Sequence, residues 1–143
     1  NCDGRLPPRG APTEEDATIL AAIEALPGLL RGHLDRQAFS DALEEVWRVI
    51  RAGNAYIDHQ APWALKKTDL ARMASVLRVL ADLLRRVATV LQPFMPDSMG
   101  KMLDQLGVPP EARSLAALAS PLPDGTVLPV PQGVFPRFVE EAV

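Results

Sequence analysis

The sequence predicts an all-α bundle of helices followed by an extended C-terminal tail. Apolar residues recur at three- and four-residue intervals in three long stretches, residues 13–36, 37–61 and 68–91, as they do in helices that bury one face. Prolines gather between these stretches and after position 120, where they exclude regular helix. We therefore divide the chain into a helical bundle, residues 1–120, and an extended tail, residues 121–143.

The first predicted helix follows an irregular opening rich in proline and glycine, residues 1–12. Thr13 is a suitable N-cap, and Asp16 three residues later completes a capping box. Pro27 lies within the apolar pattern, so we expect it to kink the helix or to split it near Gly28. The apolar stripe consists of Ile19, Ile23, Leu26, Leu30 and Leu34.

The second predicted helix starts near Gln37 and ends at Pro62, because a proline disfavours the helical conformation of the residue before it. We assign Trp47 to the core, since it lies on the apolar stripe. Gly53 interrupts that stripe at a cost of about 1 kcal/mol relative to alanine, which predicts a close approach by another backbone. We expect its neighbour Asn54 to form a hydrogen bond between helices. The stripe consists of Phe39, Leu43, Val46, Trp47, Ile50 and Ile57.

The third predicted helix is capped by Thr68 and continues to about Leu91. It is apolar on most sides, so we place it at the centre of the bundle. Its polar residues form one narrow stripe, which we interpret as a solvated face with arginine–aspartate pairs at helical spacing. The charged members of that stripe are Arg78, Asp82, Arg85 and Arg86.

Shorter elements complete the predicted fold. Asp97 opens a fourth helix that Gly107 stops, and residues 111–119 form one more short helix. In the tail, short extended pieces flank a turn at Asp124 and Gly125. We expect the tail to lie over another surface rather than to form a core of its own.

Composition and motifs exclude several classes of function. The net charge is −3, whereas a protein that grips the DNA backbone usually carries a basic surplus. One cysteine, Cys2, and two histidines allow neither an internal disulfide nor a zinc site. Charged residues interrupt the apolar stretch 73–91, which excludes an ordinary membrane span. We therefore expect no DNA or membrane partner and a reducing, cytoplasmic location.

The same survey bears on catalysis and on the extent of the protein. We find no nucleophile, metal or phosphate-loop pattern, so we predict no catalytic residue, no metal and no cofactor in this chain. Because the chain begins with Asn1 rather than methionine, we expect it to be part of a longer protein.

The candidate site is the helix break at Pro62, where Trp63 follows the break and Lys66 and Lys67 come next. A tryptophan held at such a corner can stack on a nucleic-acid base while nearby cations meet the phosphates. Asp58 opposes the helix dipole in the last turn before the break, which marks it as a further candidate. The alternatives are a packed aromatic plug at the end of the bundle, exposed lysines and a solvated aspartate.

Two other side chains in the region have structural interpretations. We expect Tyr56 to be buried with its hydroxyl hydrogen-bonded. His59, like the distant His33, lacks a catalytic partner, and we expect it to lie on the surface.

Four segments together resemble the anticodon-binding domain of bacterial methionyl-tRNA synthetase. The longest is the run Asn54–Leu65, whose centre is the break between Ala61 and Trp63. The others occur in the order typical of that family, and the resemblance covers nearly the whole chain. They are Asp35–Phe39, Leu91–Pro96 and Phe135–Arg137.

The resemblance implies both a partner and a role for the candidate site. In that family a helical bundle, joined to a class I catalytic domain, reads the CAU anticodon of methionine tRNAs. The tryptophan at the position of Trp63 stacks on the first anticodon base, and the resemblance places Pro62 and Asp58 beside it. Lys66 and Lys67 are candidates for phosphate contacts in the anticodon loop.

The chain also departs from the family pattern. The family uses an asparagine and an arginine on a helix that would precede residue 1, so we expect the bundle to lack its first helix. The catalytic domain and its ATP-binding motifs are absent as well, so ATP belongs to the parent enzyme and this chain cannot activate methionine. Two alternatives stay open: the matching domain of another class I synthetase, and a helical protein-interaction module with no RNA role.

Overall fold

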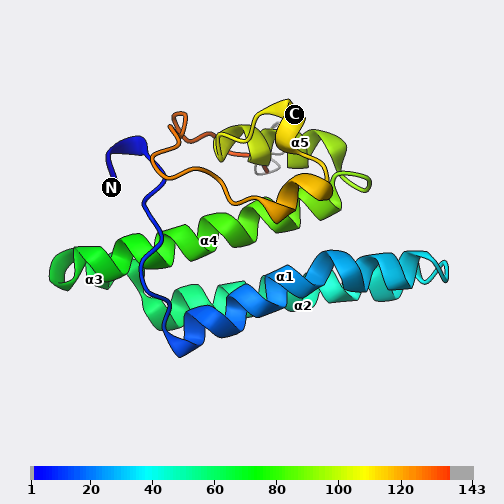
Figure 1. Ribbon diagram of the computed structural model, residues 1–143, viewed down its shortest axis with the longest axis horizontal. Helices are drawn as coiled ribbons and strands as arrows, with labels where there is room; N and C mark the ends of the chain where they lie inside the picture. Colours follow the sequence, from blue (N-terminus) through cyan, green and yellow to red (C-terminus); the bar gives the residue numbers. More distant parts are fainter. Residues whose placement is uncertain (1, 136–143) are drawn as a thin grey trace, which may run out of the picture.

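The computed structural model describes residues 2–135, most of which are helical, and it confirms the predicted all-α bundle with an extended tail. Helices α1 and α2 lie side by side, and α4 runs along them (Figure 1). Short helix α3 caps the end where α2 meets α4, while α5 and the tail cover the other side of α4. The bounds are α1 Glu14–Leu34, α2 Phe39–Gln60, α3 Pro62–Thr68, α4 Leu70–Leu91 and α5 Pro96–Gln105.

Helix α1 begins as predicted but passes through its proline. The Thr13 side chain accepts a hydrogen bond from the Asp16 backbone, and the Asp16 side chain accepts one from the Thr13 backbone, which completes the capping box. The helix does not split near Gly28. Leu26 and Leu30, on either side of Pro27, are both buried in the core, and this packing preserves the helix despite the lost backbone hydrogen bond.

The predicted turn at the end of α2 is present, and it is sharper than a simple helix end. Ala61 adopts a left-handed conformation with φ 43° and ψ 62°, and Pro62 then opens α3. The prediction of Thr68 as the next cap is wrong, because Thr68 is the last residue of α3. Asp69 caps α4 instead, its side chain accepting from the Arg72 backbone N–H.

Helix α4 is central, as predicted, but its arginine stripe is not a solvated face. Arg78 and Arg85 are only 2% and 5% exposed. Arg78 binds the carbonyls of Pro7 and Leu122 and the carboxylates of Asp82 and Asp124. The N-terminal segment and the tail therefore cover this polar stripe, which the spacing within α4 could not indicate.

The tail lies over the N-terminal segment. The Leu6 N–H donates to the Thr126 carbonyl, and the Leu6 carbonyl accepts from Gly125; Leu6 and Leu122 are both buried. The predicted turn is observed at Asp124 and Gly125. The predicted helix over residues 111–119 is instead two 3₁₀ turns, Pro110–Ala112 and Ala116–Ala119. Of the segment Phe135–Arg137 and the predicted tail, residues 136–143 lie outside the described residues.

One face of α2 borders an apolar groove of about 500 Å³ between α2, α4 and α5. Gly53 lines this groove, and a Cβ atom there would lie 2.7 Å from Leu83 Cδ1, so the close approach comes from a side chain of α4 and not from a backbone. Asn54 is exposed and forms no side-chain hydrogen bond within residues 2–135. Trp47 is 54% exposed, so its assignment to the core is also wrong. The stripe of α2 is therefore only partly covered by the described chain.

Candidate nucleic-acid interface

The side chain of Trp63 is open to solvent, with 60% of its surface exposed. It is the second residue of α3, directly after the corner. A plug at the end of the bundle would be enclosed by neighbouring helices, so this exposure argues against that alternative. An exposed indole at a fixed corner has a free face on which an unpaired base can stack.

The corner is fixed by the backbone on both sides of Ala61. The Ala61 N–H donates to the Ile57 carbonyl, and the Ala61 carbonyl accepts from Ala64 and Leu65. Pro62 is buried at the first position of α3, where its missing N–H costs nothing and its fixed φ favours helix. Of the predicted site residues, Pro62 thus holds the position of Trp63 and does not present a surface to a ligand.

Lys66 and Lys67 lie in the last turn of α3 and are exposed. They follow Trp63 by three and four residues, which puts both on the same side of the short helix as the indole. Their placement near the end of the helix also matches the sign of the helix dipole. The structure therefore brings a free aromatic face and two cations together within one helix.

Asp58 is exposed in the last turn of α2, one turn before Ala61. Within the described residues it forms no hydrogen bond or ion pair through its side chain. Its neighbour His59 is on the surface as expected, and its Nδ1 lies 3.1 Å from Glu15 Oε2. The carboxylate of Asp58 is thus available to a ligand beside the corner.

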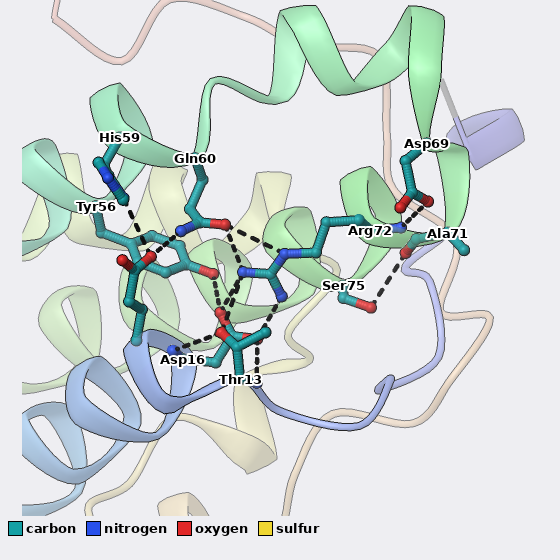
Figure 2. Close-up of polar contacts among 10 residues, drawn as sticks. Thr13, Asp16, Tyr56, His59, Gln60, Asp69, Ala71, Arg72 and Ser75 are labelled. Atoms are coloured by element: carbon teal, nitrogen blue, oxygen red, sulfur yellow. Dashed lines mark hydrogen bonds and ion pairs between the residues drawn. The ribbon is translucent and has the colours of Figure 1, made fainter.

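A polar network behind the corner joins α1, α2 and α4 (Figure 2). Asp16, only 1% exposed, accepts from Arg72 Nη1 at 2.5 Å and from Arg72 Nη2 at 2.8 Å. It also accepts from the hydroxyl of Tyr56 at 2.5 Å, which confirms the buried, hydrogen-bonded tyrosine. Arg72 donates in addition to Gln60 Oε1, from Nε at 3.2 Å and from Nη2 at 2.5 Å.

The network shifts the pKa values of Asp16, Tyr56 and Arg72 away from their ordinary values. The hydrogen bonds from Arg72 hold the pKa of Asp16 far below its usual range and outweigh the opposing effect of burial. Burial and the neighbouring Asp16 carboxylate raise the pKa of Tyr56 well above its usual range. The hydrogen bond to Asp16 raises the pKa of Arg72. At neutral pH the network therefore contains an ion pair and a neutral phenol.

Sequence reasoning found the corner but missed the network that supports it. Asp16 is identifiable from sequence only as a cap, and Arg72 is separated from it by 56 positions. Helical spacing reports which residues share a face of one helix, whereas these partners come from three helices. The one available signal was that Asp16 and Gln60 fall at helix ends, which the capping box and Pro62 had already located.

The structure gives no sign of a metal site or a membrane span in the part of the chain that it describes. Residues 2–135 contain no group of three or more His, Cys, Asp or Glu side chains arranged to hold a metal ion. Among these residues, no helix has both the length and the apolar character needed to cross a bilayer.

Comparison with known proteins identifies the family that this chain matches. Residues 6–143 match the family model described as the anticodon binding domain of methionyl tRNA ligase. The methionine–tRNA ligase of Brucella suis is 49% identical over 141 residues, which are 98% of this chain and 27% of that protein. The methionine–tRNA ligase of Mycobacterium tuberculosis strain H37Rv is 44% identical over 142 residues, 96% of this chain and 27% of that protein. The chain thus spans about 27% of the length of these relatives.

Solved structures agree with the sequence comparison. The apo crystal structure of Mycobacterium tuberculosis methionyl-tRNA synthetase has a TM-score of 0.95 and 42% sequence identity, over 99% of this chain and 29% of that one. The same synthetase in complex with methionyl-adenylate has a TM-score of 0.92 and 44% identity, over 94% of this chain and 27% of that one.

Proposed function

This chain belongs to the family of anticodon-binding domains of methionyl-tRNA ligases, and from that membership we propose that it reads the CAU anticodon of methionine tRNAs. Trp63 is the platform on which the first anticodon base stacks. Lys66 and Lys67 bind phosphates of the anticodon loop, Asp58 borders the base site, and the buried Pro62 holds Trp63 in position. The observation that carries the proposal is the exposed Trp63 ring on a rigid corner, beside two free lysines.

The physical basis is the way proteins read single-stranded RNA. Unpaired bases of a loop stack on aromatic side chains and form hydrogen bonds through their edges. Asp58 offers acceptors for such a base edge, and its side chain is not engaged elsewhere in the described chain. The net charge of −3 fits a local reading site better than a broad electrostatic surface.

The relatives are the basis for proposing the catalytic domain and ATP as partners in the parent protein. We place this domain in a cytoplasmic methionine–tRNA ligase whose catalytic domain lies outside this chain and uses ATP to form methionyl-adenylate. Anticodon binding then acts at a distance, because binding energy from a remote part of the substrate orients the reacting end. The chain itself contributes recognition and no catalytic group.

The groove beside α2 is the proposed seat of a further helix of the bundle, the one that carries the other base-reading side chains in the family. Its walls are apolar, with Ile50 and Ile57 from α2 and Leu80 from α4, and Cys2 also lines it. A helix seated there would cover these residues and the exposed Trp47, because Trp47 lies one turn before Ile50 on the same face of α2. The comparison is between the full-length ligase and this chain alone, both with Trp63 replaced by phenylalanine and Trp47 as the fluorophore followed. Acrylamide should quench Trp47 fluorescence less in the full-length ligase. Equal quenching in both would contradict this seat.

The decisive test replaces Trp63 with alanine in the full-length ligase. A stack on one base contributes ~1–3 kcal/mol, so we expect kcat/KM for methionine tRNA to fall by about 5- to 150-fold. Methionyl-adenylate formation should stay unchanged, because it takes place in the catalytic domain. Trp47→Phe is the matched control and should leave both steps unchanged.

The other outcomes separate the alternatives. Equal loss in both steps would indicate misfolding of Trp63→Ala, and circular dichroism would detect it. An unchanged kcat/KM in a folded variant would contradict the stacking role. If a CAU stem–loop then also failed to bind the full-length protein at low salt, a protein-interaction module would replace anticodon reading as the function.

A further inference from the structure

The side chain of Gln60 ties three helices together next to the corner (Figure 2). Gln60 is the last residue of α2, and only Ala61 and Pro62 separate it from Trp63. Its Oε1 atom accepts from Nε and Nη2 of Arg72 on α4, and its Nε2 donates to Glu15 on α1. Both ends of the amide are therefore occupied by groups from other helices.

The corner needs such support because its conformation is unfavourable. Ala61 has a Cβ atom and a positive φ of 43°, a combination that crowds the following carbonyl oxygen. A backbone conformation of this kind persists only where the surrounding structure fixes it, and it is frequent at functional sites. The side chain of Gln60, one residue before, is bound to Arg72 and Glu15, so it can help to fix that conformation from the other helices.

Arg72 is fully engaged inside the protein and is not available as a phosphate ligand. Its guanidinium donates to Asp16, Gln60 and Thr13, and only 17% of its side chain is exposed. A planar fork of donors can satisfy these acceptors at once, which a single ammonium group cannot do. This separates Arg72 from Lys66 and Lys67, which are exposed on the outside of the same corner.

We propose that Gln60 and Arg72 are positioning residues for tRNA recognition, because together they lock the Ala61 corner and so fix where the Trp63 ring stands. Asp16 at the start of α1 holds Arg72 in place, and Arg72 in turn holds the side chain of Gln60 beside the corner. The inference rests on the proposed anticodon-reading function and adds the residues that prepare the site for it.

The primary test is Gln60→Met in the full-length ligase, because it frees the corner without leaving the Asp16 charge unpaired. We expect the affinity for a CAU stem–loop to fall by about tenfold, a size typical of coupling between residues in contact. Gln92→Met is the matched control. Gln92 also joins two segments, through the carbonyls of Thr89 and Arg113, but at the far end of α4, and its loss should change affinity by less than about twofold.

Two further readouts distinguish positioning from a direct contact or from general stability. In a Trp63→Ala background, Gln60→Met should produce less than about twofold further loss, since its effect acts through the indole. The dependence of affinity on salt concentration should keep its slope in Gln60→Met, whereas removal of a phosphate contact lowers the slope by about one. Lys66→Ala should lower the slope in this way, because it removes a proposed phosphate contact, and it serves as the comparison.

Arg72→Lys tests the geometry of the fork separately from its charge. It keeps a cation beside Asp16, but we expect it to lose about as much affinity as Gln60→Met. Full affinity in either folded variant, while Trp63→Ala loses affinity, would overturn the positioning role and leave the proposed function intact. Losses that simply add in the Trp63→Ala background would overturn it too. If Trp63→Ala itself loses nothing, the proposed function fails first.

Discussion

Two of the largely buried arginines of helix α4, Arg72 and Arg85, are held in opposite ways. Arg72, near the start of the helix, faces the buried carboxylate of Asp16, and this contact raises its pKa. Arg85, 13 positions later, donates to the carbonyls of Ser120 and Ala117 and has no carboxylate within ion-pair distance in the described chain. Its Nε atom is buried without a partner, and burial lowers its pKa.

The difference shows what each guanidinium does for the fold. Arg72 is one half of a charge pair, so its removal would strand the other half in the interior. Arg85 holds the segment around the second 3₁₀ turn against α4 with neutral acceptors, and these would lose only a hydrogen-bond donor. We infer that the packing behind the corner at Ala61 is rigid, whereas the contact between α4 and the second 3₁₀ turn tolerates change.

Arg72→Met should have the largest effect on stability. Breaking a buried ion pair by removing one partner costs about 3–5 kcal/mol, because the Asp16 charge is left uncompensated. Urea unfolding followed by circular dichroism measures this loss. Adding Asp16→Asn to the variant should restore part of the stability, since no buried charge then remains. If the double variant were less stable than Arg72→Met, the stranded charge would not be the cause.

Asp16→Asn alone should cost less, about 1.5–3 kcal/mol at neutral pH, the range for hydrogen bonds to a charged group, because the Arg72 cation that it leaves keeps Gln60 and Thr13 as acceptors. The pKa of Asp16 is lowered in the folded protein, so its contribution is fully present above its ordinary pKa of 3.8. That contribution falls as the pH drops below this value and the folded protein takes up the proton. The stability difference between wild type and variant should therefore shrink in acid, and a constant difference would contradict the assigned ion pair.

Arg85→Met should cost less, about 1–2 kcal/mol, because it leaves only two carbonyls without a donor and removes an unpaired buried charge. Hydrogen exchange should show faster opening of the segment 116–120 and no change near Ala61. A loss as large as that of Arg72→Met would mean that the two arginines are not held in different ways.

The features that depend on residues close together in the chain could be predicted from sequence. The corner at Pro62 and the capping box at Thr13 were correct, because each depends on residues within one turn. The local break also placed Trp63 at the corner, although it left open whether the ring is exposed or packed. These features are encoded by neighbouring residues, so a single sequence contains all the information they need.

Two of the errors concern what covers a helix face. Arg85 was assigned to solvent and Trp47 to the core, and both assignments are wrong. The acceptors of Arg85 lie 32 and 35 positions away in an irregular segment, for which no periodic pattern exists. Trp47 lies on a correctly identified apolar stripe, but part of that stripe faces an open groove. Periodicity identifies a face and leaves its partner undetermined.

Tyr56→Phe should have the smallest effect, about 1 kcal/mol, because Asp16 loses one donor and keeps Arg72. Burial, with the neighbouring Asp16 carboxylate, raises the pKa of Tyr56 in the folded protein. Its contribution is therefore fully present below the ordinary pKa of 10.0 and is lost as the pH rises through the higher folded value. Urea unfolding at pH values on both sides of 10.0 should show wild type losing its advantage over the variant only on the alkaline side. An advantage that persists unchanged there would mean that the phenol is not the donor to Asp16, and that Arg72 alone stabilises the carboxylate behind the corner.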